Sequence, residues 1–283
     1  VGVNNIGAIV GRVQNQTRDI SAGILVYPND NDTGWSYEFL PSPASANISW
    51  ARKINDYGDI VGTYKLETPW PEDEGTYDGA FAINTGLYSE ADILPLTEFQ
   101  IPVRVWPVLS NSRVGIVSNL NGSYGFDFNS GSVSSIPMPS ENYYLGGERT
   151  PPSNDGQLVA YESVLVSKKR GGTYANTPAV VQDGIVLWKG DFESIPKGVN
   201  SAAEGNIVGD VIGGSWMQHA DRGYLEINDM LATQYDRNVW NSDDAYLGQI
   251  SDREDSTSFG YLGGQLGFFS DRDAFVLVPV VLP

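Results

Sequence analysis

The chain contains no cysteine and only one histidine among its 283 residues. The absence of cysteine excludes disulfide bonds, thiol catalysis and thiolate metal sites. A single histidine, His219, cannot build a multi-histidine metal site, and a Ser-His-Asp hydrolase would have to use it as the base. Because no G-x-S-x-G motif accompanies it, we interpret His219 as an ordinary loop or strand residue.

Positive charge is also scarce. Lys and Arg number 17 against 35 Asp and Glu, which gives a net charge of −18. Nucleic acids and anionic membranes bind basic surfaces, so this balance argues against both as partners. The acidic surface favours solubility in an external medium. The one basic run, Lys168-Lys169-Arg170, predicts the tip of a long hairpin, either simply exposed or docking on the acidic surface of a neighbouring copy.

Apolar residues do not recur with a helical period of 3.6 residues, so the sequence predicts no substantial helix. Instead, 32 Gly and 16 Pro are spread along the chain as turn residues. Hydrophobic residues make up 41% of the chain, which is enough for a sizeable core. These features favour an all-β protein.

A short phrase recurs along the chain, and its clearest copy is Ile54-Asn55-Asp56-Tyr57-Gly58-Asp59-Ile60-Val61-Gly62. Asn and Asp favour turns through side-chain to backbone hydrogen bonds, Gly accepts a positive φ, and Ile-Val suits a buried strand. Each copy therefore predicts a strand end, a tight turn and a new strand. Six copies begin near Val3, Ile54, Leu109, Pro152, Val199 and Ile250, at intervals of 43 to 55 residues.

A second strand is predicted later in each repeat, where a small residue precedes alternating large ones. The six segments are Ala22–Tyr27, Gly79–Ile83, Tyr124–Phe128, Pro178–Val181, Gly223–Leu225 and Asp273–Leu277. Three or four strands per repeat is the content of a propeller blade. We therefore predict a single all-β domain over residues 1–283, a six-bladed β-propeller. The alternatives are another β repeat array or a two-sheet sandwich.

The repeats resemble the extracellular HAF-repeat family, whose unit couples an IN-D-x-G-x-VVG hairpin to a later (H)AF strand. Gly79-Ala80-Phe81 and Asp273-Ala274-Phe275 are the nearest matches to that strand, and the histidine is absent throughout. The resemblance covers residues 3 to 277 and is strongest in the first two repeats. It implies a secreted or surface-displayed protein and supplies no catalytic residues.

The two ends of the sequence fit export. The chain begins at Val1 without Met, as expected of a mature product from which a signal peptide has been removed. The tail Val278-Pro279-Val280-Val281-Leu282-Pro283 resembles the entry to a C-terminal sorting or anchor signal that has been removed. The alternative is a final strand that ends there or closes the ring.

Aromatic residues beside turns are the candidates for binding, since exposed rings stack on sugars or anchor protein interfaces. The candidates are Trp35, Trp70, Tyr143, Tyr144, Trp216 and Trp240. The alternative for each is packing between blades. Trp50, Trp106 and Trp188 lie within apolar alternation and are predicted to be core residues.

Calcium is the ion that the sequence favours. Asn29, Asp30, Asn31 and Asp32 precede Gly34 and offer the oxygen ligands that a hard cation needs. The spacing of a helix-flanked calcium loop fails, because Leu40 takes the twelfth position where a bidentate Glu belongs. A polar hairpin turn explains the segment equally well.

Paired carboxylates are the remaining route to catalysis, as in glycoside hydrolysis. The candidates near strand ends are Asp56, Asp59, Asp155, Asp210 and Asp252. Most of them lie in the repeated turn, where a structural role already explains them.

We therefore predict a non-enzymatic extracellular or cell-surface protein with a structural, adhesive or assembly role. It is expected to need no cofactor, although calcium is a candidate ligand. Its expected partners are other extracellular proteins, surface glycans or further copies of itself. A carbohydrate-binding propeller and a carboxylate-dependent glycoside-active enzyme are the alternatives.

Overall fold

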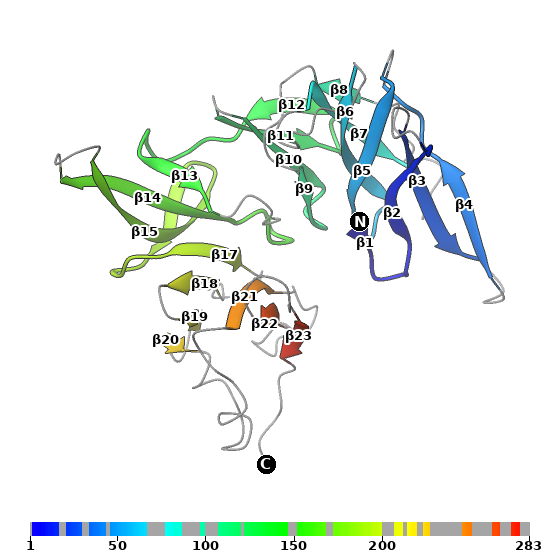
Figure 1. The fold of residues 1–283 in the computed structure, drawn as a ribbon. Coiled ribbons are helices and arrows are strands. Elements are labelled where there is room, and N and C mark those ends of the chain that lie inside the picture. Colours follow the sequence, from blue (N-terminus) through cyan, green and yellow to red (C-terminus); the bar gives the residue numbers. More distant parts are fainter. Residues whose placement is uncertain are drawn as a thin grey trace. The chain divides into compact units, whose positions relative to one another are not determined.

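In the computed structural model, strands and the turns between them make up the part of the chain that can be described, and no helix occurs in it (Figure 1). The structure describes residues 2–16, 21–29, 34–43, 46–66, 77–86, 97–99, 107–119, 122–146, 152–167, 172–199, 207–211, 214–219, 223–226, 245–250, 262–266 and 273–277. The all-β prediction is confirmed. No helix in these segments is long and apolar enough to cross a membrane.

The chain divides into two compact units, Val1–Ile136 and Pro137–Pro283. The first contains the repeats that begin near Val3, Ile54 and Leu109, and the second contains the other three. The prediction that one domain spans the chain stays a prediction.

The first unit contains an eight-stranded sheet and a four-stranded sheet. The eight strands are β1 (Gly2–Val3), β2 (Ile9–Gln14), β3 (Ser21–Pro28), β4 (Trp35–Phe39), β5 (Ile48–Ile54), β6 (Asp59–Lys65), β7 (Gly79–Asn84) and β8 (Thr97–Phe99). Every pairing is antiparallel except β3 with β5, which meet in parallel at the single pair Ser21 and Ile48. The sheet is therefore two antiparallel meanders, β1–β4 and β5–β8, joined at one point. The second sheet contains β9 (Val108–Leu109), β10 (Val114–Asn119), β11 (Gly122–Asp127) and β12 (Ser132–Ser135).

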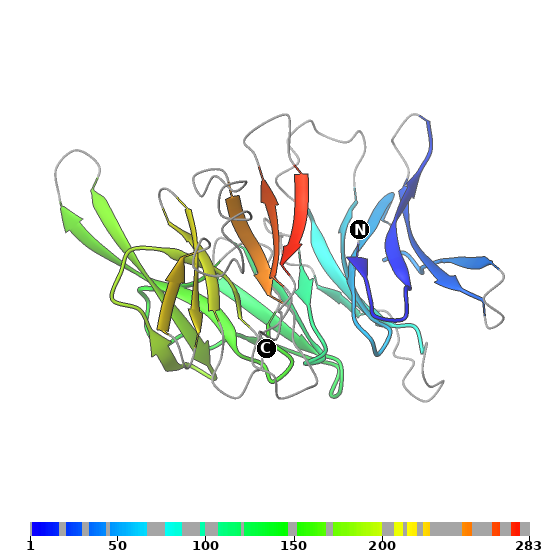
Figure 2. The same cartoon turned by 90° about the horizontal axis from the view of Figure 1, so that it is seen from below.

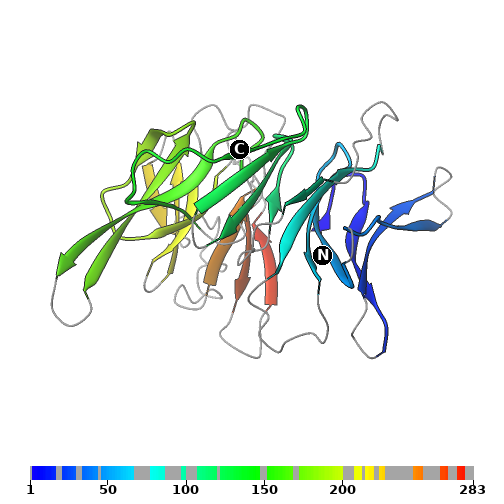
Figure 3. The same cartoon turned by 90° about the horizontal axis from the view of Figure 1, so that it is seen from above.

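The second unit contains two four-stranded sheets and one three-stranded sheet, all antiparallel. The first is β13 (Tyr143–Leu145), β14 (Leu158–Ser167), β15 (Thr173–Gln182) and β16 (Ile185–Lys189). The next is β17 (Ile195–Val199), β18 (Ile207–Val211), β19 (Gly214–His219) and β20 (Gly223–Glu226), and the last is β21 (Ala245–Ile250), β22 (Leu262–Leu266) and β23 (Asp273–Leu277). In Figures 2 and 3 the β14–β15 hairpin projects beyond its neighbouring strands.

The repeated phrase lies where it was predicted, at the turn between the first and second strands of a meander. Val3, Ile54, Leu109, Val199 and Ile250 are each the last residue of a first strand, namely β1, β5, β9, β17 and β21. One predicted strand needs correction: Gly223–Leu225 belongs to β20, the fourth strand of its sheet. The third strand there is β19, whose apolar pair Trp216 and Met217 is fully buried.

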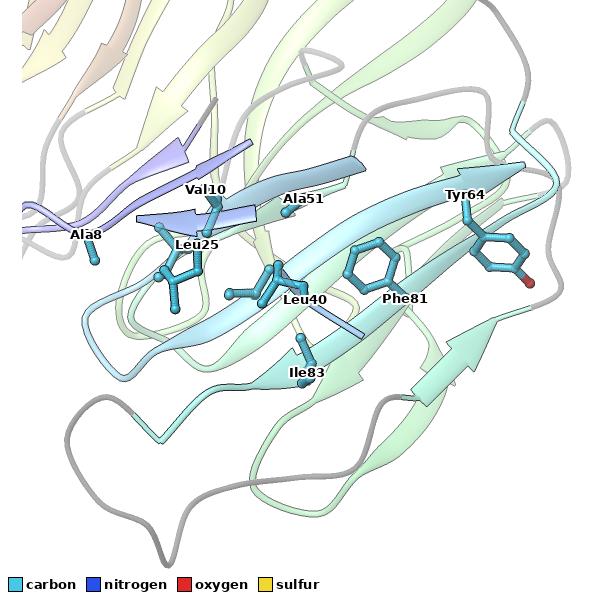
Figure 4. Packing of buried hydrophobic residues seen from close by; sticks show 10 residues of the cluster. Ala8, Val10, Leu25, Leu40, Ala51, Tyr64, Phe81 and Ile83 are labelled. Carbon is cyan, nitrogen blue, oxygen red and sulfur yellow. The ribbon is translucent and has the colours of Figure 1, made fainter. Parts of the chain in front are cut away.

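The core of the first unit lies between successive repeats (Figure 4). Ile60, Phe81 and Ile83 of the second repeat pack with Val10 and Leu25 of the first. The other face of the second repeat packs on the third through a cluster of Val61, Tyr77, Ala80, Ala82, Leu109, Val117, Phe126 and Phe128. Because both faces of the β6–β7 pair are covered, every residue of these two strands is buried.

Candidate functional site

The first two repeated turns share one internal geometry. In the first, Gly7 donates its backbone N–H to the Asn4 carbonyl at 3.1 Å, and the Asn4 side chain accepts from the backbone N–H of Ala8 at 2.9 Å. In the second, Asn55 makes the same two bonds with Gly58 and Asp59. Gly7 and Gly58 have φ values of 82° and 75°, which explains the glycine of the phrase.

The same asparagines also connect one repeat to the next. Asn4 Nδ2 donates to the Asn55 carbonyl at 3.0 Å, and Asn55 Nδ2 donates to the Ser110 carbonyl at 3.0 Å. The Asp56 carboxylate lies between two repeats, because it accepts from Asn5 Nδ2 at 2.6 Å and from Asn111 Nδ2 at 2.7 Å. We call the three linked turns, Asn4–Gly7, Asn55–Gly58 and Ser110–Arg113, the turn ladder.

The third turn departs from the pattern. Arg113 occupies the glycine position and adopts a φ of 59°, which is unfavourable for a residue with a side chain. Its guanidinium forms two hydrogen bonds with the fully buried carboxylate of Asp59, Nε to Oδ2 and Nη2 to Oδ1, both at 3.0 Å. Asn55 and Asn84 also donate to this carboxylate, at 2.9 and 2.6 Å, so both of its oxygens are hydrogen-bonded.

The carboxylates considered for catalysis form hydrogen bonds within or between turns wherever the structure describes their side chains. Asp56 and Asp59 belong to the turn ladder and its ion pair. Asp155 accepts hydrogen bonds from the Ser153 hydroxyl and from Gln157 Nε2 within the fourth turn. Asp210 lies in β18, Asp252 lies outside the described residues, and no group of three or more His, Cys, Asp or Glu that could hold a metal occurs in the described part.

Trp50 lies between the cationic groups of the first two repeats. The guanidinium carbons of Arg12 and Arg52 lie 3.9 and 3.1 Å from the centroid of the indole ring. The buried Arg52 also donates to the Thr63 hydroxyl at 3.2 Å and to the Tyr77 hydroxyl at 2.5 Å. These contacts place positive charge against aromatic faces inside the sheet, which stabilises the junction of the two repeats. Trp50 itself is half-buried, less than predicted for a core residue.

The first repeat exposes an aromatic face. Trp35, Tyr37 and Phe39 alternate along β4 and are 59%, 65% and 60% exposed. Alternate residues of a strand share one side, so the three rings project from the same face of the sheet. The rings of Tyr37 and Phe39 meet edge to face with centroids 6.0 Å apart.

This face continues across the first meander. Ile24, Val26 and Pro28 of β3 lie directly opposite Phe39, Tyr37 and Trp35. Ile9 of β2 lies opposite Val26, and Val3 of β1 lies opposite Ile9. The opposite face of the meander carries Val10 and Leu25, which are buried against the second repeat. The candidate functional site is thus the aromatic face, defined as Val3, Ile9, Ile24, Val26, Pro28, Trp35, Tyr37 and Phe39.

The predicted binding aromatics separate into four groups, and Trp216 forms the last of them. Trp35 lies on the aromatic face, as a binding role requires. In the second unit Tyr144 is half-exposed, and its ring stacks on Tyr161 with centroids 5.6 Å apart, while Tyr143 beside it on β13 is partly buried. Trp70 and Trp240 lie outside the described residues, as does the predicted core residue Trp106.

Trp216 belongs to the core, which corrects the prediction that it binds a ligand or partner. It is 0% exposed, and its indole N–H donates to the Ser194 hydroxyl at 2.7 Å. The rings of Trp188, Phe192 and Tyr224 surround it with centroids 4.8 to 6.4 Å away. The turn-rich neighbourhood suggested exposure, but Trp216 and its neighbour Met217 are both fully buried, so both sides of β19 are covered at this point.

The predicted calcium loop is described only in part. The Asn29 backbone N–H donates to the Gly34 carbonyl at 2.9 Å, and Asn29 Oδ1 accepts from the Ser36 hydroxyl at 2.5 Å. These bonds close the hairpin between β3 and β4. Asp30, Asn31 and Asp32 lie outside the described residues, as do Lys168, Lys169 and Arg170.

Sequence reasoning missed Tyr37 and Phe39. Their signal was present in Trp35-Ser36-Tyr37-Glu38-Phe39, where large aromatic residues alternate with polar ones. That period of two predicts a strand with one aromatic side.

No family model matches the chain, and no curated protein matches it. Among solved structures, the chain is similar to the β-propeller domain of the Trilobed protease from Pyrococcus furiosus, which has an open velcro topology. The two are 11% identical over 100% of this chain and 82% of that one, with a TM-score of 0.54. This likeness shows the fold alone, so the repeats are β-propeller-like.

Two weaker matches are structures of the extracellular domain of one B. thetaiotaomicron protein, described as a one-component system in one and as a hybrid two-component system in the other. Their identities are 13% and 11%, and their TM-scores are 0.37 and 0.36. This chain covers 39% of each.

Proposed function

We propose that this protein is an exported, non-enzymatic repeat protein of the β-propeller type that acts through surface contact, in a structural or adhesive role. The aromatic face carries this proposal. Three rings, each about three-fifths exposed, continue into a row of aliphatic side chains on one sheet face. A contiguous apolar surface costs solubility unless a partner covers it, so such surfaces typically mark interaction sites.

The polar residues support a role without catalysis. Asp56, Asp59 and Asp155, which a carboxylate mechanism would have used, are hydrogen-bonded within turns or between repeats. We propose no cofactor for this role. Calcium at Asn29–Asp32 remains a separate prediction from the sequence.

Export and the blade number belong to the same proposal. The net charge of −18 and the resemblance to extracellular HAF-repeat proteins support an extracellular or cell-surface location.

Six repeats that each supply one meander of three or four strands support six blades. Electron microscopy of the purified full chain would show six radial units if the blade number is right.

The functional proposal is tested on the full chain by replacing Trp35, Tyr37 and Phe39 together with Ser. We expect the variant to be secreted and folded, yet to be retained far less on the surface of the producing cells, as measured by immunoblots of surface and medium fractions. Tyr174→Ser, which changes a tyrosine of the second unit that is 54% exposed, is the control. Equal retention of all three proteins would contradict the proposal.

Carbohydrate binding is the second candidate, and the exposed indole of Trp35 favours it because aromatic rings stack on the apolar faces of sugars. A glycan array followed by calorimetry would test it. Saturable binding that is lost in Trp35→Ala and kept in Tyr174→Ala would establish this function. Failure to bind any glycan on the array would exclude it for the sugars tested.

A further inference from the structure

We infer that the β4 strand pairs antiparallel with the β4 strand of a second copy of this chain. The inference rests on the proposed function, since it names a partner for the same aromatic face. It follows from the position of β4, from its residue order and from the side chains beside it.

β4 is an edge strand. It pairs with β3 and with no other described strand, and it lies on the outer side of β3 (Figure 1). Its backbone groups on the far side are a template for a further strand. Proteins commonly protect such an edge with lysine or proline, and Trp35–Phe39 contains neither.

The residue order of β4 suits pairing with itself. In an antiparallel register centred on Tyr37, that residue faces its own copy, and Trp35 faces Phe39 of the other chain. Aromatic cross-strand pairs of this kind stabilise a sheet. Glu38 faces Ser36 instead of a second Glu38, so the register places no like charges opposite each other.

Charge is also absent from the sheet face that carries the aromatic rings. The positions on this side of β1 to β4 are all uncharged: Val3, Ile9, Gly11, Val13, Ala22, Ile24, Val26, Pro28, Trp35, Tyr37 and Phe39. Glu38 points to the other side, where its carboxylate accepts a hydrogen bond from the Tyr27 hydroxyl at 2.7 Å. Pairing of two β4 strands would therefore make one continuous apolar surface from two copies.

The edge strand of the third repeat, β12, lacks the aromatic residues of β4. β12 is Ser-Val-Ser-Ser, with all four residues exposed. A polar edge of this kind resists association, whereas β4 has three large rings in five residues. The contrast within one unit favours a specific role for β4.

Net charge predicts how association depends on salt. Two copies that each carry −18 repel one another, and the repulsion is long-ranged at low salt. Raising the salt from about 0.01 M to about 1 M shortens the screening length from about 30 Å to about 3 Å. Association through β4, whose proposed register forms no ion pair, should therefore strengthen with salt, whereas association through ion pairs would weaken.

The test uses the full chain in sedimentation experiments over a range of protein and salt concentrations, with Tyr37→Lys and Tyr37→Glu variants. Each variant alone places like charges at the centre of the interface. We therefore expect its association constant to be at least about tenfold lower than that of the unaltered chain. An equimolar mixture of the two variants should recover association, because Lys then faces Glu. Tyr174→Lys, at an exposed tyrosine of β15 in the second unit, should associate like the unaltered chain.

Recovery in the mixture would establish that position 37 faces itself. Chains that stay monomeric at all concentrations and salts, or variants that fail to recover when mixed, would overturn the inference. Loss of surface retention by the Ser triple variant in a chain that is always monomeric would leave the proposed function standing without self-pairing. If that monomer binds a glycan, the aromatic face is a sugar-binding site and not a self-association site.

Discussion

Arg113 and Asp59 join two repeats through a pair of parallel hydrogen bonds, each 3.0 Å long, between residues 54 positions apart in the sequence. Arg113 makes them from a left-handed backbone conformation at a position where the other turns have glycine. The ion pair thus holds a strained residue in place, and the buried carboxylate depends on it for charge compensation.

Replacement of Arg113 separates these two effects. Arg113→Ala removes the cation and keeps the strain, so we expect a loss of about 3 to 5 kcal/mol in the free energy of unfolding, because a buried charge loses its partner. Arg113→Gly also removes the cation but relieves the left-handed strain, and should be about 1 kcal/mol more stable than Arg113→Ala. Urea unfolding of the full chain measures both, and equal stabilities would contradict the strain argument.

Gly62 is predicted to tolerate no side chain. A Cβ there would lie 2.3 Å from Cζ of Phe81 and 2.5 Å from the backbone oxygen of Trp50. Gly62→Ala should therefore destabilise the protein by about 1 to 3 kcal/mol through overpacking. Gly125→Ala is the control, since its nearest contact would be an ordinary 3.4 Å to Val114. Similar unfolding midpoints for the two variants would show that the Phe81 ring and the backbone yield.

Truncation of two tryptophans should change the free energy of unfolding by very different amounts. Trp216→Ala removes a fully buried ring and should cost about 3 to 5 kcal/mol. Trp35→Ala removes an exposed ring and should change stability by less than about 0.5 kcal/mol. Thermal unfolding followed by circular dichroism measures the difference. A large loss in Trp35→Ala would mean that the aromatic face is covered within the chain.

The Asp127 carboxylate should stabilise the folded protein at neutral pH, and this stabilisation should disappear at acidic pH. Burial alone would raise the pKa of this carboxyl, but hydrogen bonds from the Asn129 backbone and the Ser130 hydroxyl outweigh it and lower the pKa below its ordinary value. A lowered pKa in the folded state stabilises the protein above the unfolded-state value of about 3.9, and this contribution is lost as pH falls through the folded-state value.

The measurement compares Asp127→Asn with the unaltered chain from neutral pH to about pH 3. Asn keeps one acceptor but no charge, so the variant should be less stable at neutral pH. The difference should shrink as pH falls below about 4, where the unfolded carboxyl takes up its proton. A difference that stays constant with pH would show that the turn does not favour the ionised form.

Local chemistry made the repeat predictable. Asn55 and Gly58 form a turn through bonds that reach only two to four residues along the chain, and the sequence contains all of that information. The links between turns, such as Asn4 to Asn55, join residues 51 positions apart. They depend on how successive sheets stack, which no pattern within one repeat records.

The site was predicted only in part for the same reason. Trp35 and Trp216 have similar turn-rich surroundings in the sequence, yet one is exposed and the other buried. Whether such a tryptophan is exposed or buried depends on which sheet face the neighbouring repeat covers. The alternation in Trp35–Phe39 indicates a strand with an aromatic side, but the exposure of that side appears only once the other side is found packed on the second repeat.

The turn ladder also constrains how such a chain can grow or shorten. A repeat inserted within the ladder must present a turn carbonyl that accepts from the asparagine before it, and an asparagine that donates to the carbonyl after it. The loops that take no part in this linkage are free to differ, which accommodates repeat lengths of 43 to 55 residues. Duplication of a gene segment in this family of turns would therefore succeed when its ends fall in those loops, and fail when they divide the turn.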